Sequence, residues 1–138
     1  MEQVIEFTLH HPFLVGVLAL LICVLIFTEM RKGGQAISSH DLTKLVNQEG
    51  GVIVDIREKN DFNKGHIVDS LHIPYARLKE RASELSKYQD KPLIIVDAMG
   101  QHAGMAGKIL KDTGLTKVMK LKGGINTWQA DSLPLAKK

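Results

Sequence analysis

Residues Pro92 to His102 read PLIIVDAMGQH. The apolar run Pro92 to Val96 is typical of a strand that is buried on both faces of a sheet. A polar loop, Asp97 to His102, follows it, and Ala103 to Thr113 has the spacing of a helix that ends at Gly114. A buried strand that passes through a loop into a helix predicts an α/β domain with a parallel sheet.

The flanking sequence continues this alternation of strands and helices. Further short strands, bounded by Gly or Pro, are expected at Val52 to Asp55, Leu71 to Ile73 and Val118 to Leu121. Further helical segments are expected at Ser38 to Gln48, Lys59 to Lys64, Tyr75 to Leu85 and Ile125 to Ala130. Ser38 followed by Asp41 predicts a capping box for the first of these helices. The pattern therefore predicts a central, mostly parallel sheet with helices on both faces.

The N-terminal segment is too apolar for a helix at the surface of such a domain. No formally charged residue occurs from Phe7 to Thr28, and Phe13 to Phe27 read FLVGVLALLICVLIF. A buried core helix in a domain of this size should have a polar face, and this segment has none. A cleaved signal peptide should begin with Lys or Arg and end in small residues, and neither feature is present. We therefore expect one transmembrane helix that contacts the lipid bilayer.

The distribution of charge predicts the orientation of this helix. All 18 Lys and Arg residues lie at Arg31 or beyond, whereas Glu2 and Glu6 precede the apolar run. The remaining 13 of the 15 acidic residues against 18 basic ones leave +5 on the later part. Because positive residues stay in the cytoplasm, we expect the N-terminus outside and the domain inside. The charge is too mild, and too little interleaved with aromatic residues, to indicate nucleic-acid binding.

Small residues recur on one side of the apolar segment. Gly16, Ala19 and Cys23 share a helical face, which would permit weak self-association of helices. Ordinary composition explains the stripe better, because small residues are common in membrane helices. Cys23 is the single cysteine of the chain, so neither an intramolecular disulfide nor a cysteine metal cage is expected.

The loop after PLIIV is the candidate site. Ligands of parallel α/β sheets bind beyond the carboxyl ends of the strands. This loop also leads into the N-terminus of a helix, where N–H groups favour an anion. The candidate residues are Asp97, Ala98, Met99, Gly100, Gln101 and His102.

Two separate stretches resemble the signatures of rhodanese-like domains. The first is VDIREKNDFNKGHIVDSLHIP, Val54 to Pro74, with Asp55, Arg57, Asp61-Phe62, Gly65-His66-Ile67 and Ile73-Pro74 in the order of that family. The second is VMKLKGGINTWQADSLPL, Val118 to Leu135, with paired glycines, Trp128 and Pro134. The resemblance covers about Ile37 to Leu135 and implies a rhodanese-like domain at 37–135. Together with the apolar run, it predicts a membrane anchor at residues 1–30, a linker at 31–36 and a basic tail at 136–138.

The resemblance implies a sulfurtransferase fold, but one residue conflicts with sulfur transfer. Rhodaneses carry sulfur as a persulfide on a cysteine that opens this loop, and Asp97 stands there, with His102 near the usual arginine. A carboxylate forms no stable persulfide and repels anionic substrates, although it can itself accept the converging N–H bonds. We therefore expect no enzyme activity, no cofactor and no metal site.

Other candidate residues have a structural role by the same resemblance. Asp55 and Arg57 are expected to form a fixed ion pair, and Gly65 and His66 belong to a structural motif. A metal site that uses His66, His72 and His102 with Asp97 lacks a spacing signature. We expect Trp128 to cover the core.

Three functional hypotheses remain. The first is a binding or scaffolding module that presents the loop to a cytosolic or membrane protein partner. The second is a subunit of a sulfurtransferase whose partner supplies the cysteine. The third is an enzyme with other chemistry at Asp97 and His102. A bacterial inner membrane fits the expected orientation best.

Overall fold

The computed structural model describes residues 1–32 and 34–137. The chain forms two compact units, Met1–Arg31 and Lys32–Lys138, and each is considered by itself. Gly33 in the expected linker and Lys138 in the expected basic tail lie outside the described residues.

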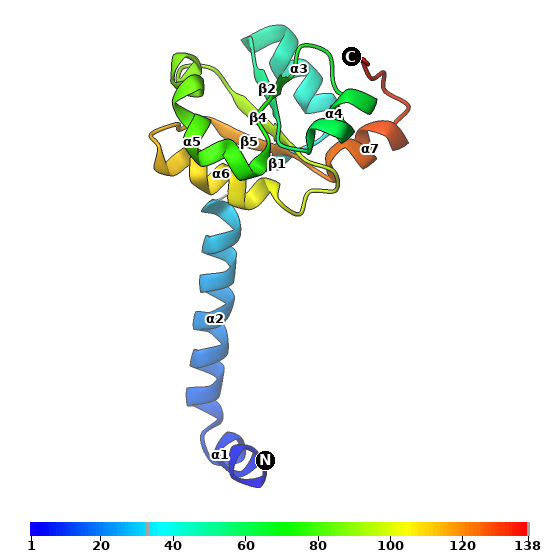
Figure 1. Cartoon of the computed structure of the whole chain (residues 1–138). Coiled ribbons are helices and arrows are strands. Elements are labelled where there is room, and N and C mark those ends of the chain that lie inside the picture. The colour runs from blue at the N-terminus through cyan, green and yellow to red at the C-terminus, as the bar shows by residue number, and fades with distance from the viewer. Residues whose placement is uncertain (33, 138) are drawn as a thin grey trace. The chain divides into compact units, whose positions relative to one another are not determined.

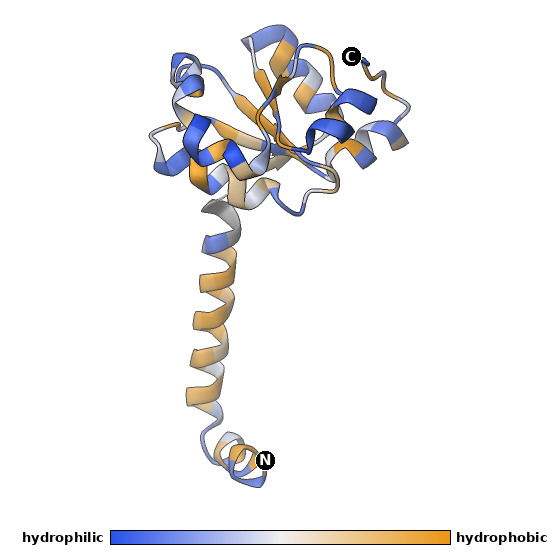
Figure 2. Ribbon diagram, viewed as in Figure 1, coloured by the Kyte–Doolittle hydropathy of each residue, from blue (hydrophilic) through white to orange (hydrophobic). Residues whose placement is uncertain are grey.

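The first unit contains two helices, α1 (Glu2–His10) and α2 (Pro12–Lys32). Helix α1 ends at His10, and the next residue, His11, is not helical because the residue before a proline is disfavoured in the helical region of backbone space. Within α2, the stretch Pro12–Glu29 has a mean hydropathy of 2.5, and none of it is buried. Figure 2 shows apolar residues along almost the whole of α2. This helix is long and apolar enough to cross a membrane.

The second unit is built on a five-stranded sheet in which every pairing is parallel (Figure 1). The strands are β1 (Gln35–Ile37), β2 (Val52–Asp55), β3 (Leu71–His72), β4 (Leu93–Val96) and β5 (Val118–Leu121). Their order across the sheet is β1-β5-β4-β2-β3, so β4 is central and β3 lies at one edge. The α/β architecture with a parallel sheet, predicted from the alternation of the sequence, is confirmed.

Helical segments connect the strands and cover both faces of the sheet (Figure 1). They are α3 (Ser39–Glu49), α4 (Lys59–Lys64), η1 (Tyr75–Arg77), α5 (Leu78–Arg81), η2 (Ala82–Tyr88), α6 (Ala103–Asp112) and α7 (Gly124–Ala130). Ser38 caps α3, because its hydroxyl accepts a hydrogen bond from the Asp41 N–H at 3.1 Å. The predicted helix start is therefore confirmed.

Successive residues of the central strand serve two different cores. Ile95 joins a cluster with Leu78, Leu85 and Leu110, from α5, η2 and α6. Its neighbour Ile94 points the other way, into a second cluster. That cluster contains Leu42 of α3 and Ile125 and Trp128 of α7. Because side chains alternate along a strand, an unbroken apolar strand needs cover on both faces, which these helices provide.

The structure differs from the sequence expectation at several places. Gln35 and Ala36, assigned to the linker, belong to β1 and pair with β5. The segment expected as one helix, Tyr75 to Leu85, is divided into η1, α5 and η2. Strand β4 begins at Leu93 rather than at Pro92. Ala136, placed in the tail, forms an antiparallel bridge with His66.

Candidate functional site

The candidate loop, residues 97–102, lies between the end of the central strand β4 and the start of α6. Because all five strands are parallel, their carboxyl ends lie along one edge of the sheet, and the loop is at the middle of that edge. The position expected from the sequence is therefore the position found.

The carboxylate of Asp97 accepts hydrogen bonds from main-chain N–H groups at residues 100, 102 and 103. Its Oδ1 accepts the N–H of Gly100 at 2.7 Å. Its Oδ2 accepts the N–H groups of His102 at 2.8 Å and of Ala103 at 3.1 Å. The last two donors begin α6, whose N-terminus favours negative charge. Asp97 is only 3% exposed, so the loop closes around a built-in anion.

Helix α7 holds the loop through main-chain hydrogen bonds. The N–H of Ile125 donates to the carbonyl of Asp97 at 2.8 Å, and that of Asn126 donates to the carbonyl of Ala98 at 3.0 Å. Gly124, with φ +62°, lies so close to these carbonyls that a Cβ would collide with them. The paired glycines belong to the second signature stretch, but their contact with the loop depends on tertiary packing and was not predicted.

The remaining side chains of the loop face outward. Ala98, Met99, Gln101 and His102 are exposed, and Met99 is 54% exposed. Gly100 has φ +92°, a backbone region that favours glycine, which allows the chain to turn back toward Asp97. The loop therefore combines a buried anionic centre with an accessible rim.

The His102 imidazole lies against an aromatic ring. Its centroid is 5.5 Å from that of Tyr75, a residue of η1 that the sequence analysis did not connect with the site. The contacts of Asp97 are with the His102 main chain instead. The arrangement resembles a structural cap more than an acid and base that share a proton, because both Asp97 oxygens already accept main-chain hydrogen bonds.

Asp55 and Arg57 form the fixed ion pair that was predicted. The guanidinium binds the carboxylate through two nitrogens, Nη2 at 2.8 Å and Nε at 3.0 Å, and the Arg57 N–H also donates to Asp55. Arg57 Nη2 reaches the carbonyl of Gly65 at 2.7 Å as well. Because Asp55 is 1% exposed, the pair is a buried connection between β2 and the chain after α4.

Two histidines enclose the ring of Phe62. The ring of His66 stacks on it with centroids 3.9 Å apart, and that of His72 stacks on it at 4.4 Å. His66 Nδ1 is 2.9 Å from the Phe62 carbonyl, and His72 Nε2 is 2.8 Å from the Arg57 carbonyl. The structure therefore places both histidines in a packed framework.

Trp128 packs in the core and anchors the last described residues. It is 6% exposed and belongs to the cluster under α3 and α7. Its indole N–H donates to the Pro134 carbonyl at 3.0 Å. The prediction that Trp128 covers the core is confirmed.

Comparisons with known proteins agree with this architecture. The model of the rhodanese-like domain family matches residues 38–131. The chain is 34% identical to the uncharacterized protein YibN of Escherichia coli over 141 residues, which cover 99% of both chains. It is 30% identical to thiosulfate sulfurtransferase GlpE of Coxiella burnetii over 94 residues, 68% of this chain and 86% of that protein.

A solved structure of a rhodanese-related protein is also similar to this chain. The crystal structure of a rhodanese-related protein from Thermoplasma volcanium is similar with a TM-score of 0.68 and 26% sequence identity. The match covers 75% of this chain and 99% of that one. The chain therefore belongs to the family of rhodanese-like domain proteins.

Proposed function

We propose that this protein is a membrane-anchored rhodanese-like domain that performs no sulfur transfer and binds a protein partner through the loop at residues 97–102. The observation that carries the proposal is the carboxylate of Asp97, which accepts three main-chain N–H groups of the loop. By the family resemblance, the persulfide-bearing cysteine would stand at this position.

The chemistry of the two groups separates them. A thiolate attacks a sulfane sulfur and then holds it in a polarizable S–S bond, which a carboxylate cannot form stably. The anionic carboxylate also occupies the N–H groups that a thiosulfate or phosphate ion would need. The single cysteine of the chain, Cys23, lies within the apolar helix α2 and not in the rhodanese-like domain.

The exposed rim of the loop supports a binding role. Met99 has an adaptable apolar side chain, a kind that is enriched at protein interfaces. Gln101 and His102 beside it can donate and accept hydrogen bonds. The Asp97 carboxylate and the main chain of α7 both form hydrogen bonds with the loop. Because these bonds already fix the loop conformation, binding a partner would cost little conformational entropy.

The apolar helix α2 supports a location at a membrane. We place the rhodanese-like domain in the cytoplasm and the N-terminus outside, because the Lys and Arg residues follow the helix. An anchor would restrict the domain to the membrane surface and raise its effective concentration toward membrane partners. A bacterial inner membrane agrees with the relatives in Escherichia coli and Coxiella burnetii.

A second function is favoured by one comparison. Because a relative at 30% identity is named thiosulfate sulfurtransferase, the domain could position a sulfur-carrying cysteine that a partner supplies. In that case the partner that contacts Met99 would have a reactive cysteine, and sulfur transfer would appear only when both proteins are present.

Photocrosslinking in membranes tests the proposal. A photoreactive residue replaces Met99 at the loop or Leu18 in the apolar helix, and Glu49, exposed at the end of α3, is the control position. We expect a discrete protein adduct from Met99 and none from Glu49. An adduct from Leu18 alone would assign recognition to the helix instead. Lipid adducts alone, or equal adducts at Met99 and Glu49, would contradict a binding role for the loop.

A further inference from the structure

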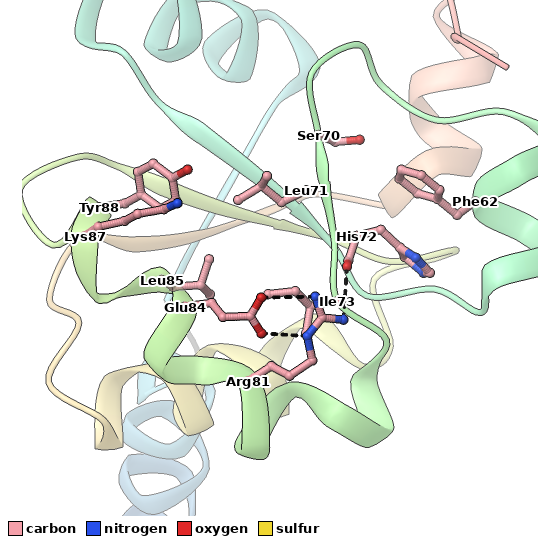
Figure 3. A pocket seen from close by; sticks show the side chains of 10 residues that line it. All are labelled: Phe62, Ser70, Leu71, His72, Ile73, Arg81, Glu84, Leu85, Lys87 and Tyr88. Atoms are coloured by element: carbon pink, nitrogen blue, oxygen red, sulfur yellow. Dashed lines mark hydrogen bonds and ion pairs between the residues drawn. The ribbon is translucent and has the colours of Figure 1, made fainter. Parts of the chain in front are cut away.

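A cavity of about 430 Å³ lies beside β3, away from the Asp97 loop. Strand β3 is an edge strand of the sheet, and no other strand of the described residues covers its outer side. The α5 and η2 segments form the opposite wall (Figure 3). We name it the β3 cavity, and its lining residues are Phe62, Ser70, Leu71, His72, Ile73, Arg81, Glu84, Leu85, Lys87 and Tyr88. Its volume is within the range of small-molecule sites.

The lining of the β3 cavity is divided about equally between apolar and polar groups. Leu85 and Ile73 are buried, and Leu71 and Tyr88 are partly exposed toward it. Figure 3 shows Leu71 projecting from β3 toward the Tyr88 side of the cavity. The exposed parts of Leu71 and Tyr88 would bind the apolar body of a ligand by removing its surface from water.

The charges at the mouth of the cavity favour an anion. Arg81 forms two hydrogen bonds with Glu84, at 2.7 and 3.2 Å, and these largely balance each other. Lys87 remains as the second cation, with its Nζ 5.1 Å from the centroid of the Tyr88 ring. Lys91 approaches the same ring at 5.8 Å. Of the side chains that line the cavity, Arg81 and Lys87 are basic and Glu84 is acidic, so one basic group is in excess.

We propose that the β3 cavity binds a small amphiphilic anion, with its carboxylate or phosphate at Lys87 and its apolar body against Leu71 and Tyr88. Two sources share this chemistry: a soluble organic acid and the headgroup region of an anionic lipid. The site is independent of the loop and of the partner proposed for it.

The test uses the full chain in nanodiscs with methyl-labelled leucine, observed by NMR. In one arm, nanodiscs of phosphatidylcholine are titrated with 4-phenylbutyrate. In the other arm, no acid is added and the nanodiscs are an equal mixture of phosphatidylcholine and phosphatidylglycerol. We expect the methyl signals of Leu71 and Leu85 to shift in at least one arm, and the arm identifies the source.

A charge reversal distinguishes the cavity from general attraction to a basic protein. Lys87→Glu should weaken binding roughly tenfold, as measured by the shifts of the Leu71 and Leu85 methyl signals. The reason is that it replaces an attraction to the anion by a repulsion. Lys108→Glu is the matched control, since Lys108 is exposed on α6 and does not line the cavity. Unchanged Leu71 and Leu85 signals in both arms, or equal effects of the two variants, would overturn the proposal.

Discussion

At the scale of single residues, Asp97 links stability to function. Its carboxylate satisfies three N–H groups of the loop, two of them at the start of α6. Hydrogen bonds to a charged acceptor are the stronger kind, and a donor left unpaired in a buried site costs more than the bond itself contributes. The residue that prevents persulfide chemistry by our account therefore also holds the loop in shape.

Asp97→Asn should destabilise the fold although it is nearly isosteric. The new amide can offer its oxygen to one side of the loop, but its NH₂ then faces other N–H donors. We expect a loss of about 2 kcal/mol in the free energy of unfolding, measured by urea denaturation. Asp131→Asn, at an exposed position after α7, is the control. A change below about 0.5 kcal/mol, as at ordinary surface sites, would show that the carboxylate does not stabilise the loop.

At the scale of elements, the contact between α7 and the loop can be tested with a pair of glycines. Gly124 and Gly50 have nearly the same φ, +62° and +67°, but only Gly124 lies against other backbone atoms, those of the loop. Both Gly→Ala changes should incur the cost of a left-handed conformation. Gly124→Ala should lose about 1–3 kcal/mol more than Gly50→Ala in thermal unfolding, because its Cβ displaces the loop. Equal losses would mean that α7 and the loop are not in close contact.

The ion pair at the mouth of the β3 cavity predicts a pH dependence. The pKa of Glu84 is lowered, first by the hydrogen bond from Arg81 and further by the positive charges of Arg81 and Lys87. A lowered pKa in the folded state means that the pair contributes stability above the unfolded-state pKa of about 4.3. This contribution is lost as the pH falls through the lower folded value.

Glu84→Gln should therefore lower the melting temperature slightly near neutral pH and have no effect in acid. The effect is small because the pair is exposed to solvent. Thermal unfolding of the unchanged protein and of Glu84→Gln, followed in parallel from acid to neutral pH, measures this difference in melting temperature. A difference that stays constant through the titration range would contradict the pairing.

The elements that the sequence predicted well are those with strong local patterns. The apolar strand at residues 93–96 and the Ser38 cap carry their information within a few residues. Strand β1 has two exposed residues in three and exists through its pairing with β5, so its pattern was too weak to find. In the site, the acceptor role of Asp97 followed from its chemistry. The contacts of Tyr75, Gly124 and the β3 cavity depend on packing between distant segments and could not be predicted.

At the scale of the whole molecule, the apolar helix should determine where the protein is found. The chain should remain in the membrane fraction after carbonate extraction, whereas a chain without residues 1–30 should be released. Release of the full chain would contradict a membrane span. A chain whose N-terminus is found removed after expression would indicate a signal sequence instead.

Cysteine labelling tests the orientation. On a Cys23→Ser background, Gln3→Cys should react with an impermeant maleimide in intact cells. Lys108→Cys, at an exposed position on α6, should react only after permeabilisation. The reverse pattern would place the domain outside the cytoplasm.

The central claim is that an intact N–H cradle is filled by a carboxylate where rhodaneses carry sulfur. The most direct measurement is mass spectrometry after incubation with thiosulfate, on Cys23→Ser chains with and without Asp97→Cys. A thiolate at this position would attack the sulfane sulfur, and the S–S bond of thiosulfate would break to release sulfite. We predict one added sulfur atom on the Asp97→Cys chain and none on the chain that retains Asp97. Sulfur on the Asp97 chain, or a folded Asp97→Cys chain that never accepts sulfur, would contradict the account.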